Sequence, residues 1–70
     1  MDIEKLTKQR IEEMKVGTVY VLREVTSDVL NSTRSLIAKY KADAMMDGGE
    51  FDYTTDIDRE ARVLTVKRTR

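Results

Sequence analysis

The stretch TSDVLNSTRSLIAKYKADAMMDGG, residues 26–49, decides the fold because it contains one amphipathic helix together with both of its ends. Thr26, Ser27 and Asp28 are N-cap candidates, since short polar side chains accept hydrogen bonds from the free amides of a first helical turn. Gly48 and Gly49 follow the last apolar residue, and glycine favours the left-handed conformation that commonly ends a helix. We therefore predict a helix from about residue 27 to about residue 46. Its apolar face has helical spacing and comprises Val29, Leu30, Thr33, Leu36, Ile37, Tyr40 and Ala44.

Upstream of this helix the pattern predicts a shorter helix and then a strand. Residues 2–15 are predicted to form a helix with Asp2 as the N-cap. One broad face of this helix comprises Ile3, Leu6, Thr7, Ile11 and Met14. Gly17 marks the end of this first helix. Residues 18–23 are β-branched and aromatic, which favours a short strand.

Downstream, two segments alternate between apolar and polar side chains, the pattern of half-buried strands. They cover residues 51–57 and 62–68, and a four-residue loop between them, 58–61, predicts a β-hairpin. In the resulting register, Ile57 lies opposite Arg62, Thr55 opposite Leu64, Tyr53 opposite Val66, and Phe51 opposite Arg68. This arrangement gathers every apolar side chain of the hairpin except Val63 on one face.

The order of elements predicts an α+β protein with a single domain, residues 1–70, since a chain of this size has only one core. We expect the short strand and the hairpin to form a three-stranded antiparallel sheet in a winged-helix-like arrangement. Too few residues are available to cover both faces of that sheet, so we also expect a homodimer with Val63 or Tyr20 at its seam. The predicted core contains Ile3, Leu6, Ile11, Val19, Val21, Val29, Leu30, Leu36, Ile37, Tyr40, Phe51, Tyr53, Leu64 and Val66.

Composition argues against an enzyme and against a cofactor. The chain contains no cysteine and no histidine, so it lacks thiolate metal ligands, disulfides and the commonest general base. Asp56, Asp58 and Glu60 have the spacing that opens a calcium loop. Ala61 replaces the required glycine, however, and Lys67 stands where a bidentate carboxylate is needed, so we predict no metal site.

Charge is the most informative feature for function. Thirteen basic and thirteen acidic residues cancel, but they are segregated along the chain. Basic side chains without neighbouring acids lie in the middle of the long helix and in the last strand. We predict that these residues bind nucleic-acid phosphates, with short polar groups beside them that reach base edges or phosphates. The predicted nucleic-acid site comprises Asn31, Arg34, Ser35, Lys39, Lys41, Lys67, Arg68 and Arg70.

The alternative hypothesis is that the protein binds another protein through the acidic stretch that separates these two basic regions. Residues 43–60 contain seven acids and only one base, Arg59. An acidic hairpin of this kind is suited to docking on a basic protein surface. In this reading the protein regulates or inhibits another protein, and the docking residues are Asp47, Glu50, Asp52, Asp56 and Asp58.

The layout is similar to that of small bacteriophage-encoded regulatory proteins, which combine a glycine-led strand, one long helix and a closing hairpin. The matching features are Gly17, the helix from Ser27, Phe51 and the closing Val66-Lys67-Arg68. This resemblance implies a regulator that acts in the host cytoplasm on nucleic acid or on a host protein. No apolar run is long enough to span a membrane, and the first residues lack a secretory pattern, so we expect a cytoplasmic protein with no membrane partner.

Overall fold

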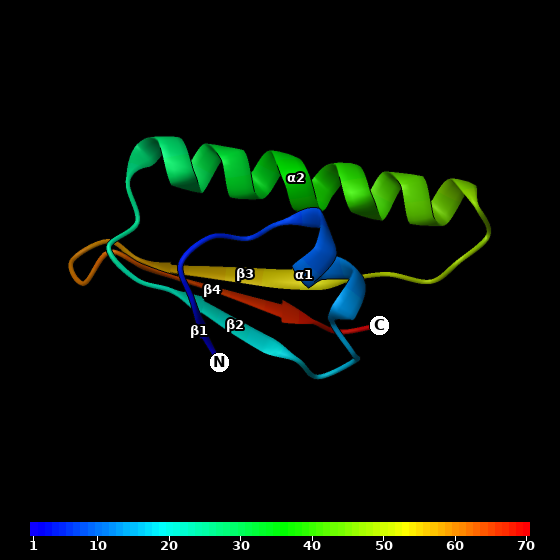
Figure 1. Ribbon diagram of the computed structural model, residues 1–70, viewed down its shortest axis with the longest axis horizontal. Coiled ribbons are helices and arrows are strands. Elements are labelled where there is room, and N and C mark those ends of the chain that lie inside the picture. The colour runs from blue at the N-terminus through cyan, green and yellow to red at the C-terminus, as the bar shows by residue number, and fades with distance from the viewer.

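The computed structural model describes residues 1–70, and its two helices lie over one face of a single sheet (Figure 1). The elements in chain order are β1 (Asp2–Ile3), α1 (Lys8–Glu13), β2 (Val19–Leu22), α2 (Ser27–Met46), β3 (Tyr53–Asp58) and β4 (Val63–Arg68). The predicted α+β class is therefore confirmed. Neither helix has the length and apolar character that crossing a membrane requires.

The sheet has four strands in the order β1-β2-β4-β3, not the three that we predicted. The additional strand, β1, pairs in parallel with β2, which makes the sheet mixed. Two main-chain bonds fix the pairing, because the N-terminal amine donates to the Val19 carbonyl and the Met1 carbonyl accepts from Val21. Strands β2, β4 and β3 form the antiparallel set that we predicted, with β4 in the middle, and β1 is added outside it.

Helix α1 is much shorter than the predicted helix over residues 2–15. It begins after Thr7, whose hydroxyl accepts from the Arg10 amide at 3.2 Å, and it ends at Glu13 because Met14 is extended. Residues 2 and 3 belong to β1 instead of the helix. The apolar spacing nevertheless identified inward-facing residues, because Ile3, Leu6, Ile11 and Met14 are all buried.

Helix α2 confirms the predicted bounds. Thr26 is its N-cap, and its hydroxyl accepts from the Val29 amide at 3.3 Å. At the other end Gly48 has a φ of +79°, and the Gly49 amide donates to the Ala44 carbonyl at 2.9 Å. This left-handed turn stops the helix where the glycine pair indicated.

The hairpin is present, but its register is shifted by two residues. Ile57 pairs with Leu64, Thr55 with Val66 and Tyr53 with Arg68, so the loop is Arg59–Arg62 and not 58–61. Asp58 stabilises the loop, since its Oδ1 accepts from the amides of Glu60 and Ala61 at 3.1 Å each. A shift of two residues preserves the side-chain period of a strand, so the predicted faces are retained.

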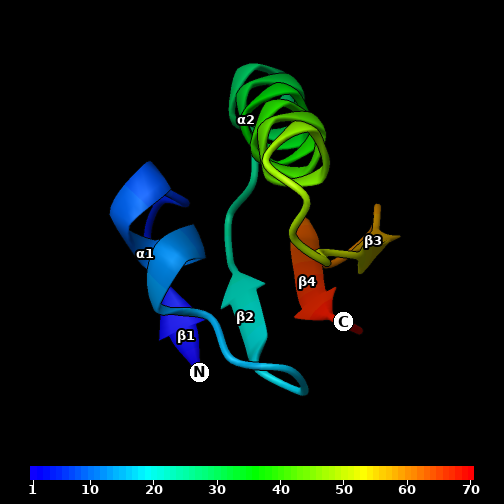
Figure 2. The ribbon, with the colours of Figure 1, turned by 90° about the vertical axis from the view of Figure 1, so that its right-hand side faces the viewer.

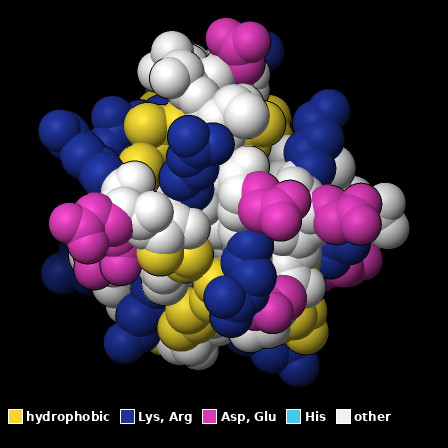
Figure 3. All heavy atoms as spheres, turned by 90° about the vertical axis from the view of Figure 1, so that its left-hand side faces the viewer, with side chains coloured by type: hydrophobic (Ala, Val, Ile, Leu, Met, Phe, Trp, Pro, Cys, Tyr) yellow, Lys and Arg dark blue, Asp and Glu magenta, His cyan; other side chains and the backbone are white.

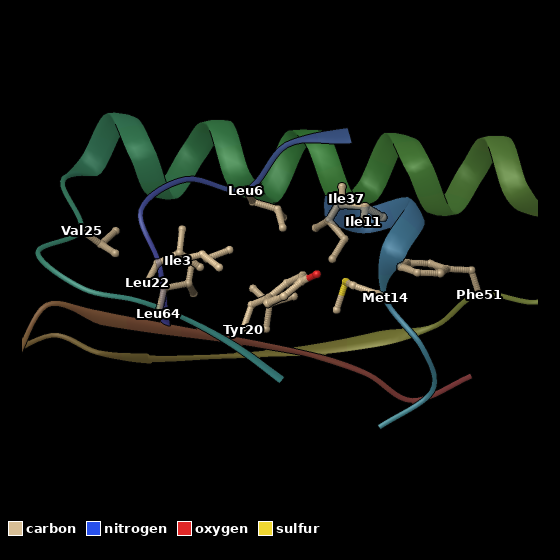
Figure 4. Packing of buried hydrophobic residues seen from close by; sticks show 11 residues of the cluster. Ile3, Leu6, Ile11, Met14, Tyr20, Leu22, Val25, Ile37, Phe51 and Leu64 are labelled. Carbon is tan, nitrogen blue, oxygen red and sulfur yellow. The ribbon is translucent and has the colours of Figure 1, made fainter. Parts of the chain in front are cut away.

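The core lies between α2, α1 and the sheet (Figure 4). Val19 and Val21 were predicted to belong to it, and this prediction is wrong because they lie on the opposite face of β2, where they are half-buried. Tyr20 and Leu22 point into the core instead. Tyr20 is therefore not available at a dimer seam. The buried apolar residues are Ile3, Leu6, Ile11, Met14, Tyr20, Leu22, Val25, Ile37, Phe51, Leu64 and Val66.

Candidate functional site

The predicted nucleic-acid residues divide between three parts of the surface. Four of them, all exposed, lie on the solvent side of α2: Asn31, Arg34, Ser35 and Lys39. None of their side chains takes part in a hydrogen bond or an ion pair within the chain. The structure therefore brings this half of the predicted set together on one helical surface.

Lys41 is held by an internal partner. Its Nζ lies 3.0 Å from Oδ1 of Asp52 and 5.8 Å from the centre of the Tyr53 ring. The hydrogen bond from Lys41, with a second one from the Tyr53 amide, holds the pKa of the Asp52 carboxyl below its usual range. Lys41 and Asp52 thus neutralise each other at the start of β3, which removes one residue from each predicted site.

Arg68 ties the end of β4 to the rest of the molecule. Its guanidinium donates to the main-chain carbonyls of Met14 and Glu50, while its Nε donates to the Arg70 carbonyl at 2.6 Å. The same group lies 5.0 Å from the centre of the buried Phe51 ring. These contacts give Arg68 a structural role, because three of its donors already have acceptors within the chain.

Lys67 and Arg70 lie away from the α2 group. Lys67 is exposed on the outer face of the sheet, since it neighbours the half-buried Val19 on β2 and the exposed Thr54 on β3. Helix α2 covers the other face, so Lys67 and Arg34 cannot contact one straight duplex together. Arg70 is exposed after the last strand.

The acidic residues are less committed to internal partners. The structure contains two ion pairs, Arg23–Asp2 and Lys41–Asp52, so Asp56 and Asp58 on β3 have none. Both side chains are exposed and lie on the outer side of the sheet, where Lys67 is a diagonal neighbour of Asp56. Asp47 and Glu50 are also exposed, in the connection from α2 to β3.

A β-branched surface lies directly beside Asp56 and Asp58. We call it the outer sheet face, and it comprises Val19, Val21, Val63 and Thr65, all half-buried. The register places Val21, Thr65 and Asp56 in one row across three strands, and it places Val63 beside Asp58. No helix covers this face, because α1 and α2 both lie on the other side of the sheet (Figure 2).

Sequence reasoning missed the outer sheet face because Val19-Tyr20-Val21-Leu22 is apolar at every position. A strand of this kind has no polar alternation to show which side is buried. Two signals favoured burial of Tyr20 and Leu22 over Val19 and Val21, namely the large aromatic ring of tyrosine and the larger apolar area of leucine. In the structure the Tyr20 hydroxyl donates to the Arg10 carbonyl at 3.0 Å, which satisfies this polar group inside the core.

At the end of the molecule where α2 begins, the surface carries no patch of a single charge. Figure 3 views this end, and Lys and Arg side chains alternate there with Asp and Glu side chains. No group of three His, Cys, Asp or Glu side chains is arranged to hold a metal ion. The geometry therefore directs attention to β3 and the outer sheet face.

Comparison of the chain with protein-family models, with curated proteins and with solved structures gives no significant match. The resemblance to bacteriophage regulators accordingly stays a prediction.

Proposed function

We propose that this protein is a non-enzymatic binding protein that docks on a basic protein surface through β3 and the adjoining outer sheet face. Asp56 and Asp58 supply negative charge without an ion-pair partner, and Val19, Val21 and Val63 supply an apolar area on the same face. Protein interfaces combine these two features, an apolar centre that excludes water and a polar rim that steers the partner.

One observation carries this proposal: the two carboxylates of β3 are exposed beside an uncovered β-branched face, and neither has an ion-pair partner, although Asp58 also accepts from two loop amides. By contrast, Lys41 and Arg68 of the basic set already have internal partners, and Lys67 lies on the opposite side of the sheet from α2. Two uncommitted charges remain on each face, Arg34 and Lys39 on α2 and Asp56 and Asp58 on β3, but only the pair on β3 lies beside an uncovered β-branched face.

The test is retention of proteins from cell lysate by three immobilised forms, each with and without nuclease treatment. The first form is unmodified. The second carries Asp56→Lys and Asp58→Asn, because asparagine keeps the Oδ1 that accepts from the loop amides. The third is the matched control, Arg34→Glu with Lys39→Glu, which changes charge on the exposed side of α2.

We expect one protein to be retained by the unmodified form and by the α2 control regardless of nuclease, and to be lost with the β3 variant. Docking through β3 would be contradicted if the β3 variant retained the same protein as the unmodified form. It would also be contradicted if nuclease treatment abolished retention.

Nucleic-acid binding is the second candidate, and the exposed group on α2 favours it. Asn31, Arg34, Ser35 and Lys39 are free of internal partners on one side of a 20-residue helix. A fluorescence anisotropy titration with mixed-sequence duplex and single strands tests this candidate. If α2 binds nucleic acid, we expect binding at ~50 mM salt that weakens steeply as salt rises. The Arg34→Glu, Lys39→Glu form should then not bind. No binding by the unmodified protein at this salt removes the candidate.

A further inference from the structure

Strand β3 is the open edge of the sheet. The strand order ends at β3, and Figure 2 shows no element beyond it on that side. The other edge strand, β1, has only two residues, whereas β3 has six. An unpaired edge of this length is a template for one more strand.

The hydrogen-bond pattern identifies which backbone groups of β3 are free. The Thr69 amide donates to the Asp52 carbonyl at 2.9 Å, so Asp52 and Thr69 face each other as a hydrogen-bonded pair. Bonding alternates along an antiparallel ladder, and in the observed register Thr54, Asp56 and Asp58 therefore bond to β4. The amides and carbonyls of Thr55 and Ile57 consequently point to the open edge.

The start of the edge is closed by a side chain. The amide of Tyr53 also points away from β4, but it donates to Oδ1 of its neighbour Asp52 at 2.9 Å. That carboxylate is in turn held by Lys41. The open part of β3 is therefore centred on Thr55 and Ile57, the same part that carries Asp56 and Asp58.

We propose that β3 binds its partner by strand addition, and that the added segment is an extended peptide in which basic and apolar side chains alternate. This inference rests on the function proposed above and specifies its mode of binding. On the outer side, the new strand places side chains beside Asp56 and Asp58, which favours Lys or Arg at those positions. Asp56 and Asp58 are non-hydrogen-bonded positions toward the new strand, where opposing side chains approach most closely.

On the inner side, the added strand meets a hollow whose base is apolar and whose rim at the hairpin loop carries Arg59 and Arg62. Ile57 is half-buried and lines a hollow with Val25 and Leu30 between the start of α2 and the hairpin loop. An apolar side chain beside Ile57 extends this contact, so the recognised pattern is basic, apolar, basic. Main-chain bonds supply affinity in this mode, and the alternate side chains supply specificity.

A second copy of this chain does not fit the same edge. An antiparallel β3–β3 pair centred on Asp56 or on Ile57 places Asp56 opposite Asp56 or Asp58 of the other copy, and like charges at such positions destabilise a strand pair. The charge of β3 therefore selects a basic segment of a different protein.

The experiment uses a labelled, end-capped peptide of alternating Lys and Val, titrated into the full chain by fluorescence anisotropy. A block peptide of the same composition, three Lys followed by three Val, is the matched probe without the alternation. We expect the alternating peptide to bind about tenfold more tightly than the block peptide, and about tenfold less tightly to the Asp56→Asn, Asp58→Asn form. Amide hydrogen exchange of the complex should show new protection at Thr55 and Ile57 and little change at Thr54 and Asp56.

A proline variant separates strand addition from simple charge attraction. Thr55→Pro removes an amide that bonds to no group within the chain, and proline is tolerated at such an edge position. We expect this variant to keep its thermal stability and to lose the alternating peptide. Binding that needs Asp56 and Asp58 but survives Thr55→Pro and protects neither Thr55 nor Ile57 would overturn strand addition while supporting docking on a basic partner. Failure of the alternating peptide to outbind the block peptide would also overturn strand addition, and the lysate experiment would then decide the proposed function separately.

Discussion

Replacing Ile37 tests the packing of α2, on which the position of every surface residue of that helix depends. Ile37 has 0 % of its surface exposed, and it faces the core between α1 and the sheet. Ile→Ala at such a site removes apolar contacts and leaves a cavity, at a cost of ~2–5 kcal/mol in unfolding free energy. A chain of this size usually has ~3–5 kcal/mol in total, so Ile37→Ala should be largely unfolded or close to it.

Two companion variants make this prediction quantitative. Ile37→Val removes one methylene and should cost ~0.5–1.5 kcal/mol, which remains measurable in a folded protein. Leu36→Ala is the matched control, because Leu36 is adjacent but only half-buried, and we expect ~1–2 kcal/mol for it. Urea denaturation followed by circular dichroism gives each value by linear extrapolation. A Leu36→Ala cost equal to or greater than that of Ile37→Ala would refute the observed rotation of α2 about its axis.

Three further predictions concern the ends of the strands. Arg68→Met should lower the free energy of unfolding in urea by ~1–3 kcal/mol, because the carbonyls of Met14 and Glu50 lose their donor. Arg70→Met should change it by less than ~0.5 kcal/mol, and equal effects of the two variants would contradict the structural role of Arg68. The pKa of Asp52 is lower in the folded protein than in the unfolded chain, so the Asp52 carboxyl binds a proton more tightly in the unfolded chain. The contribution of Asp52 to stability is therefore full above the usual aspartate pKa and is lost as pH falls through the pKa of the folded state. Asp52→Asn should therefore flatten the loss of stability in acid, and a pH profile parallel to that of the unmodified protein would count against the Lys41–Asp52 contact. Gly17→Ala should lower stability by ~1–2 kcal/mol because Gly17 has a φ of +89°, and an unchanged melting temperature would argue against that conformation.

Local signals explain why α2 and the hairpin were predictable. Thr26 and Gly48 specify the ends of α2 through short-range hydrogen bonds, which the sequence displays directly. Alternation from Tyr53 to Ile57 and from Leu64 to Val66 specified the buried side of the hairpin, and that side survived a two-residue error in register. Asp58 is the residue that set the true register, because its carboxylate organises the loop that follows it.

Features that depend on contacts distant in sequence were not predictable. Strand β1 exists only through its pairing with β2, and two residues are too few to show a periodic pattern. The role of Arg68 depends on Met14, 54 residues away, and nothing in the local sequence separates it from a solvent-facing arginine. The same holds for the candidate site, since the sequence located Asp56 and Asp58 but could not show that β3 is an edge.

The most direct test of the central claim is amide hydrogen exchange of β3 in the free protein. An open edge predicts alternation: slow exchange at Thr54, Asp56 and Asp58, which donate to β4, and fast exchange at Thr55 and Ile57, which have no acceptor. Tyr53 should fall between these groups because Asp52 accepts from its amide. Uniform protection from Thr54 to Asp58, independent of protein concentration, would show that the chain itself covers this edge and would contradict binding through β3.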